Sequence, residues 1–247
     1  ITTIDWHEKG SATTEIPMLK VSFTPALNLT RATFEIPFGF IERPAEGREV
    51  PALRWVDISQ REYGVSLLNN CKYGHDVQGN TIRLTLVRSP YEPDANPDEG
   101  IHELIYSLYP HRRDWRAAST ERRGYELNQP LLAVVESNHG GELPAECSFL
   151  TISPKNVVVS ALKMLEPDGI LAPLPPSKKA MILRFYESQE KSVVAKIRLN
   201  CDILAVEEAD MMERPFRSIS FSGKEIKMPL GKYEIKTLRI ISSLPGT

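Results

Sequence analysis

The sequence predicts an all-β fold made of two β-sandwich units. Apolar and polar residues alternate in many short stretches, which is the pattern of strands with one buried face. The 19 prolines and 14 glycines are spread along the chain, as expected where turns join many strands, and helical patterns are scarce. With 247 residues, of which 41% are hydrophobic, the chain can bury one large core or two ordinary ones.

The expected strands follow one another along the chain. The first ten residues, ITTIDWHEKG, already read as extended structure, and the first residue is Ile1 rather than Met, so we expect a piece of a longer polypeptide. Alternation is clearest in NTIRLTLVRS and SVVAKIRLN, and the letters VQGN before Thr81 supply hairpin chemistry. The other strands are predicted at residues 18–25, 32–40, 63–70, 131–137, 156–162, 180–187 and 234–242.

The stretch PDEGIHELIYSLYPH has apolar side chains on both faces. His102 and Leu104 share one face with the alternate residues after them, and Ile105 and Tyr109 lie on the other. This pattern predicts a core strand over residues 104–110, packed between two sheets.

Two stretches have helical character. Residues 114–130 begin with Asp114 as an N-cap and end at Pro130, and they predict a helix that Gly124 weakens. Residues 205–215, AVEEADMMERP, are compatible with a helix or with a strand and turn.

The predicted boundary between the units lies near residues 149–156, where a long β region gives way to shorter strands. The two units are therefore expected at 1–153 and 154–247. Residues 165–180 hold four prolines and read as an exposed loop between two strands.

Charge and cysteine usage exclude several classes. The formal net charge of −2, with both signs interspersed, argues against a nucleic-acid surface. No run of 18 apolar residues predicts a membrane helix, and the N-terminus shows no secretory signal pattern. Cys71, Cys147 and Cys201 are far apart and odd in number, which predicts free thiols in a reducing cytoplasm.

The sequence offers no catalytic or metal motif. Its five histidines form no HxH, HxD or HExxH pattern, and GxSxG, GxGxxG and P-loop motifs are absent. A charged, proline-rich loop with Glu42 and Arg43 leads to Trp55. Such a loop needs packing and hydrogen bonds, so these residues are read as an interdomain clamp, with plain loop structure or a ligand contact as alternatives.

Several stretches, in order, resemble the C-terminal β region of glycoside hydrolase family 38, the class II α-mannosidases, and most closely their cytosolic and bacterial branch. These stretches are IDWHEKG, ATFEIPFGFIERPAEGREVPALRWVDIS, YGVSLLNNCKYGHDV, IRLTLVRSPYEPD with PDEGIHELIYSLYPH, YELNQPL, SFLTISPKNVVVSALKMLE, LRFYE and YEIKTLRI.

This resemblance implies an architecture and a reaction. Family members have an N-terminal α/β zinc domain, a helical bundle, a β-supersandwich like that of galactose mutarotase and a terminal β-sandwich. Residues 1–153 would be an N-terminally cut supersandwich and residues 154–247 the terminal unit. The reaction would be hydrolysis of α-mannosides with retention, which uses two carboxyl groups about 5–5.5 Å apart.

The resemblance implies that the zinc ion and the nucleophile belong to the N-terminal domain of the family, and no HxD motif occurs in this chain. We therefore expect no catalytic residue, metal or other cofactor in this chain, and no mannosidase activity of the chain alone. Its implied partners are the catalytic and helical domains of the same polypeptide, α-mannoside substrate through the parent enzyme, and further copies of itself, since family members often form oligomers.

The resemblance also implies a loop at the rim of the sugar site. Lysosomal and Golgi members present Arg-Gly there, whereas this chain has Glu99-Gly100. We expect Asp98 or Glu99 to accept hydrogen bonds from sugar hydroxyls, with Gly100 allowing close backbone approach. The alternative is a solvated loop between strands.

Four further residues join this predicted rim. His102 follows the loop, and Tyr73, His75 and Asp76 are expected in a neighbouring loop. A rival interpretation is an independent carbohydrate-binding or mutarotase-like protein, in which His102 faces one pocket together with Glu99 or His75.

Overall fold

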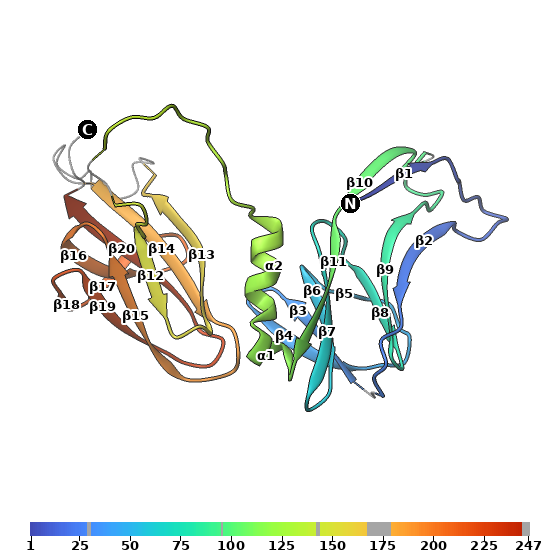
Figure 1. Cartoon of the computed structure of the whole chain (residues 1–247), viewed down its shortest axis with the longest axis horizontal. Helices are drawn as coiled ribbons and strands as arrows, with labels where there is room; N and C mark the ends of the chain where they lie inside the picture. The colour runs from blue at the N-terminus through green and yellow to red at the C-terminus, as the bar shows by residue number, and fades with distance from the viewer. Residues whose placement is uncertain (29–30, 95, 142–143, 167–178, 244–247) are drawn as a thin grey trace. The chain divides into compact units, whose positions relative to one another are not determined.

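The computed structural model describes residues 1–28, 31–94, 96–141, 144–166 and 179–243, and it divides into two compact units, Ile1–Val134 and Val135–Thr247 (Figure 1). Both units are built from antiparallel β-sheets, so the predicted all-β class is confirmed. The division falls before residue 153, because the strand Leu150–Ser153 pairs with a strand of the second unit. The predicted boundary after that strand therefore differs from the observed one.

The first unit contains three sheets. The two-stranded sheet has the order β1-β10, the four-stranded sheet β2-β9-β8-β5 and the five-stranded sheet β11-β7-β6-β3-β4. The strand bounds are β1 Thr2–Trp6, β2 Met18–Phe23, β3 Arg31–Ile36, β4 Gly39–Pro44, β5 Val50–Pro51, β6 Trp55–Ser59, β7 Tyr63–Asn69, β8 Gly74–Gln78, β9 Thr81–Arg88, β10 Gly100–Leu104 and β11 Tyr106–Arg112.

The two larger sheets of this unit lie as two layers around one core (Figure 1). Phe34, Val56 and Leu67 come from the five-stranded sheet, and Ile82 and Leu84 come from the four-stranded sheet. All five side chains are at most 1% exposed, as the alternating pattern predicts for the inner face of a sandwich.

The predicted helix over 114–130 is two short helices, α1 Trp115–Ala118 and α2 Thr120–Asn128. Asp114 caps α1 as predicted, because its carboxylate accepts a hydrogen bond from the Ala117 amide at 3.0 Å. Ser119 has φ of 54° and breaks the helix there. Gly124 lies within α2, where an added Cβ would be 3.2 Å from Trp55, so this glycine permits close packing of the helix on the sheet.

The second unit is a β-sandwich of a four-stranded sheet, β12-β15-β19-β18, and a five-stranded sheet, β13-β14-β20-β16-β17. Side chains from both sheets form its core, among them Leu183, Ile197, Ile226 and Leu238, each fully buried. The bounds are β12 Leu150–Ser153, β13 Val157–Met164, β14 Lys179–Glu187, β15 Val193–Leu199, β16 Asp202–Ala209, β17 Pro215–Ser218, β18 Phe221–Ser222, β19 Glu225–Leu230 and β20 Ile235–Ser243.

Three local predictions need correction. The strand predicted over 104–110 is interrupted at Ile105, because β10 and β11 belong to different sheets, and Leu108 is 40% exposed rather than sandwiched. Residues 131–137 form no strand, and Leu132 is 95% exposed. The strand predicted over 32–40 is a hairpin, since Ile36 pairs with Gly39.

Other predictions have clear outcomes. For residues 205–215 the strand and turn are observed, because β16 runs to Ala209. Most of the loop predicted at 165–180 lies outside the described residues. Gly79, with φ of 57°, and Asn80 join β8 to β9, as the hairpin chemistry predicts.

Candidate functional site

The loop before β10 is a polar surface on the first unit. Lys9 holds this loop through two interactions. Its Nζ lies 2.9 Å from Glu99 Oε2 and donates a hydrogen bond to Asn96 Oδ1 at 2.6 Å. The Asp98 carboxylate is exposed and makes no hydrogen bond or ion pair with any residue that the structure describes. Asp98 therefore has free acceptor oxygens, whereas Glu99 is partly engaged by Lys9.

The backbone of this loop bends sharply where it enters β10. Asp98 has φ of 56° and Gly100 has φ of 122°, and Gly100 pairs with Trp6 at the end of the β1–β10 ladder. Only glycine adopts a φ of that value without strain. His102 Nε2 donates a hydrogen bond to the Asp98 carbonyl at 2.6 Å, so this histidine fixes the loop.

The seven predicted rim residues do not form one group. Tyr73 is 60% exposed, but its loop lies beside the junction of β10 and β11, since the Asn70 amide donates to the Ile105 carbonyl at 3.1 Å. Gly100 is at the opposite end of β10, which at about 3.3 Å per residue is more than 10 Å away. Only Asp98, Glu99, Gly100 and His102 lie together.

His75 and Asp76 lie in strand β8 and not in an exposed loop. His75 is fully buried, its Nδ1 donates to the Tyr73 carbonyl at 3.2 Å, and its Nε2 accepts from Asn69 at 3.3 Å. Burial lowers the pKa of His75 to about 4, so its imidazole is neutral. These contacts explain His75 as a structural residue.

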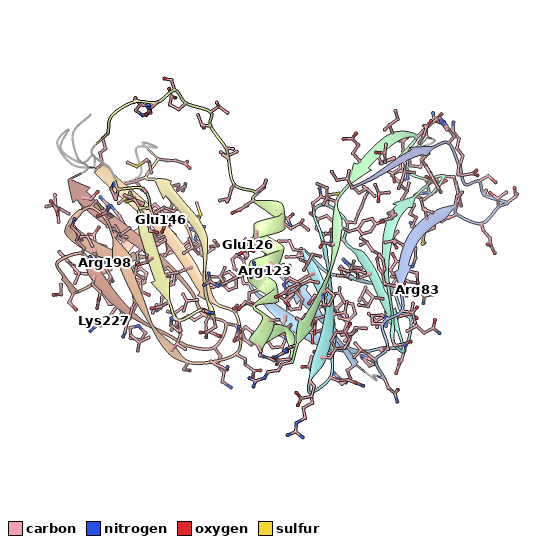
Figure 2. All side chains as sticks on the ribbon, viewed as in Figure 1. Arg83, Arg123, Glu126, Glu146, Arg198 and Lys227 are labelled. Carbon is pink, nitrogen blue, oxygen red and sulfur yellow. The ribbon has the colours of Figure 1, made fainter. Side chains whose placement is uncertain are left out.

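The Asp76 carboxylate is 2% exposed and holds two cations. Lys20 Nζ lies 2.8 Å from Asp76 Oδ2. Arg83 belongs to β9 and is labelled in Figure 2, and its Nε lies 2.5 Å from Asp76 Oδ1. Both carboxylate oxygens are thus occupied, and neither is free for a sugar hydroxyl.

The predicted clamp residues make contacts within the first unit. Trp55 is 1% exposed and packs against Trp115, with ring centroids 5.0 Å apart. Glu42 is exposed and its Oε2 lies 3.6 Å from Arg31 Nε. Arg43 lies over Phe34, with its guanidinium carbon 5.2 Å from the ring centroid. A clamp to another domain stays a prediction for Glu42 and Arg43.

One buried polar cluster was not predicted. Ser66 Oγ donates to Asp57 Oδ2 at 2.7 Å, His111 Nε2 donates to the same oxygen at 2.7 Å, and Thr120 Oγ1 lies 2.9 Å from Ser66 Oγ. In a nucleophilic triad the histidine lies between the serine and the carboxylate. Here Ser66 bonds the carboxylate directly and is fully buried, so these residues do not form such a triad. They come from β6, β7, β11 and α2, a set that no local motif could reveal.

The surface charges on α2 are also satisfied locally. Arg123 Nη1 donates to Glu126 Oε2 at 2.6 Å, and the two residues are neighbours on α2 in Figure 2.

Among the described residues, no group of three or more His, Cys, Asp and Glu side chains could hold a metal ion. A zinc ion therefore finds no fitting ligand set in that part of the chain. No helix in the described ranges is long and apolar enough to cross a membrane.

The fold places the chain among β-sandwich proteins, and comparison with known proteins narrows this class. Residues 1–96 match the family model described as "Glycosyl hydrolases family 38 C-terminal domain", and residues 156–238 match "Glycosyl hydrolases family 38 C-terminal beta sandwich domain". The two matches together cover more than half of the chain. The chain belongs to glycosyl hydrolases family 38 and corresponds to its C-terminal β region.

Curated relatives agree with this assignment. The chain is similar to "Alpha-mannosidase 2C1" of Homo sapiens, with 31% identity over 255 residues that cover 99% of this chain and 23% of the relative. It is also similar to "Alpha-mannosidase G" of Dictyostelium discoideum, at 29% identity, covering 98% of this chain and 22% of the relative. The chain thus spans about a quarter of the length of these relatives.

A solved structure shares the fold. The crystal structure of an alpha-mannosidase from Enterococcus faecalis V583 superposes with a TM-score of 0.71 at 18% identity, covering 90% of this chain and 25% of that chain.

Proposed function

We propose that this chain is the non-catalytic C-terminal β region of a retaining, zinc-dependent α-mannosidase, which supports the catalytic domain and lends the Asp98–Gly100 loop to the rim of the sugar site. The observation that carries the proposal is the match itself, because nearly the whole chain aligns with about a quarter of each relative. The zinc ion and the nucleophile would then reside in the rest of the polypeptide.

The first test separates the chain from its parent. The purified chain should not hydrolyse an aryl α-mannoside, whereas the full-length polypeptide should do so in a zinc-dependent manner. Turnover by the purified chain that a chelator abolishes would contradict the non-catalytic assignment.

The rim role has a separate test in the full-length enzyme. Asp98→Asn removes charge from the free carboxylate and should raise KM for a mannoside with little change in stability. Glu103→Gln, an exposed carboxylate on β10, is the matched control. Equal kinetics of the Asp98 variant and wild type would exclude the rim role and leave the support role standing.

The alternative is an independent carbohydrate-binding or mutarotase-like protein. A mutarotase needs a histidine and a carboxylate in one pocket, but His75 is buried in β8, and His102 Nε2 is held by the Asp98 carbonyl. A mutarotation assay of the chain with glucose, galactose and mannose distinguishes the two, and an accelerated rate would favour the alternative.

A further inference from the structure

A pocket of about 440 Å³ lies between the edge strands of the two larger sheets in the first unit. Strand β4 is the edge of one sheet and β5 is the edge of the other, and residues 45–49 connect them. The volume lies within the range of small-molecule sites. The lining residues are Phe34, Arg43, Pro44, Glu46, Arg48 and Val50.

Arg43 has an unsatisfied donor at this pocket. Its Nη1 is buried and has no hydrogen-bond acceptor among the residues that the structure describes. The guanidinium lies over the ring of Phe34, which is 1% exposed. A buried unpaired donor is costly, so a small movement of this side chain toward an acceptor in the pocket, either water or a ligand, would be favourable.

Glu49 follows the lining residue Arg48 in the chain, but its carboxylate is engaged elsewhere. Glu49 Oε2 lies 2.7 Å from Lys20 Nζ, and Glu49 Oε1 accepts a hydrogen bond from Thr85 at 2.8 Å. Arg48 is exposed and forms no ion pair with a described residue. The lining of the pocket therefore includes two arginines, and Glu46 is the one acidic residue among the lining residues.

The walls of the pocket are fixed before any ligand arrives. The Gly47 amide donates to the Val77 carbonyl at 2.8 Å, and the Gly79 amide donates to the Ala45 carbonyl at 2.9 Å. Gly47 has φ of 81°, and an added Cβ would be 3.3 Å from Gln78, so a side chain there would disturb this connection. A preorganised pocket loses less freedom on binding.

We propose that this pocket binds a monosaccharide-sized molecule that carries an oxyanion, such as a sugar phosphate or a uronate. Arg43 and Arg48 supply planar donors that suit phosphate and carboxylate oxygens. The exposed Glu46 can accept hydrogen bonds from hydroxyl groups, and the exposed Pro44 offers an apolar surface to C–H groups. The site is separate from the Asp98 loop and does not depend on the mannosidase assignment.

Calorimetric titration of the intact chain tests this proposal. The probes are glucose 6-phosphate, glucuronate, inorganic phosphate and glucose. We expect saturable binding of one or both sugar anions, weaker binding of inorganic phosphate, and much weaker binding of glucose. If glucose 6-phosphate alone binds, the oxyanion is a phosphate, and if glucuronate alone binds, it is a carboxylate.

Variants locate the binding. Arg43→Met should weaken affinity about tenfold or more, because it removes charge-assisted hydrogen bonds. Arg48→Gln, at an exposed position that tolerates change, should weaken it several-fold and covers the case in which the Arg43 variant does not fold. Arg31→Gln is the matched control, since Arg31 is exposed on the neighbouring strand β3 and lies outside the lining.

Three results with the chain itself would overturn the proposal. They are the absence of saturable binding of both sugar anions at millimolar concentration, equal affinity for glucose and glucose 6-phosphate, and an equal loss of affinity in Arg31→Gln and Arg48→Gln. Binding by the chain that disappears in the full-length polypeptide would also refute a ligand role, and would show that another domain occupies the pocket.

Discussion

Asp57 and His111 form a buried ion pair, with 2.7 Å between Asp57 Oδ2 and His111 Nε2 and side chains that are 1% and 3% exposed. The pair links β6 to the edge strand β11, and Ser66 on the strand between them donates to the same carboxylate oxygen. The burial of this network makes its protonation state a determinant of the stability of the first unit.

The first prediction concerns the pH dependence of this pair. Burial lowers the pKa of His111, but the hydrogen bond and charge of Asp57 outweigh it, so the pKa lies above its usual value. The stabilising contribution is therefore complete below the unfolded-state pKa of about 6.5 and is lost as pH rises through the folded-state pKa. NMR titration of the His111 ring should show the raised pKa.

Unfolding experiments give the matching stability readout. All three tryptophans, Trp6, Trp55 and Trp115, lie in the first unit, so their fluorescence reports on that unit. The loss of stability in His111→Gln, relative to wild type, should be larger near pH 6 than near pH 9. His139→Gln, at an exposed position, is the control. A loss that grows with pH would contradict the assigned protonation.

Removal of one partner gives the second prediction. Asp57→Asn should destabilise the first unit by about 1–3 kcal/mol, because Ser66 and His111 lose a charged acceptor in a buried site. His111 can then lose its proton, so no uncompensated charge remains. Urea unfolding followed by tryptophan fluorescence measures the change. A loss below about 1 kcal/mol, typical of a surface pair, would show that the pair contributes little.

The third prediction tests the close packing beside His111. An added Cβ at Gly64 would overlap the His111 ring and lie 2.6 Å from Ser59 Cβ. Gly64→Ala should therefore destabilise the first unit by about 1–3 kcal/mol through overpacking. Gly140→Ala is the control, since nothing lies within 4 Å of a Cβ there. Equal stability of both variants would show that the sheet relaxes around the methyl group.

The fourth prediction concerns His75, whose contribution to stability should depend on pH in the opposite direction to that of His111. Because burial lowers its pKa to about 4, folded His75 stays neutral while the unfolded chain takes up a proton. Its stabilising contribution is present above about pH 6.5 and is lost as pH falls toward the folded-state value. The stability difference between wild type and His75→Gln should thus narrow on acidification. A difference that is constant with pH would contradict a neutral buried His75.

The alternation of apolar and polar residues predicted most of the strands. The alternation in residues 80–89 and 192–200 gave β9 and β15, because one buried face forces a period of two. The same logic failed for residues 131–137, since an apolar run needs a partner strand that sequence cannot specify. The alternation also predicted one strand over residues 104–110, where the structure has the end of β10 and most of β11. The two strands belong to different sheets, and alternation does not show which sheet a strand enters.

The candidate site shows a similar limit. Asp98, Glu99 and Gly100 were singled out through the family resemblance, and the structure places Asp98 and Glu99 at the surface. Their role at a sugar site stays a prediction. His75 and Asp76 were misplaced because Lys20, Asn69 and Arg83, which hold them, are distant in the sequence or belong to other strands. Arg43 was singled out, but its unpaired Nη1 is visible only in three dimensions.

The last prediction concerns where the second unit begins. Strand β12 pairs with β15 over Leu150–Ser153, and Leu150 and Ile152 pack against the core of this unit. A fragment of residues 135–247 should therefore fold by itself, whereas a fragment of residues 154–247 exposes the flank of β15 and should be less stable. Far-UV circular dichroism melts compare the two.

A point variant distinguishes the effect of losing the packing of β12 from the effect of shortening the chain. In the 135–247 fragment, Ile152→Ala should cost about 1–2 kcal/mol, because Ile152 is partly buried and such truncations cost more only when fully buried. Thr151→Ala, exposed on the same strand, should change stability by less than about 0.5 kcal/mol. If residues 154–247 melt at the same temperature as residues 135–247, β12 is dispensable and the boundary lies after residue 153.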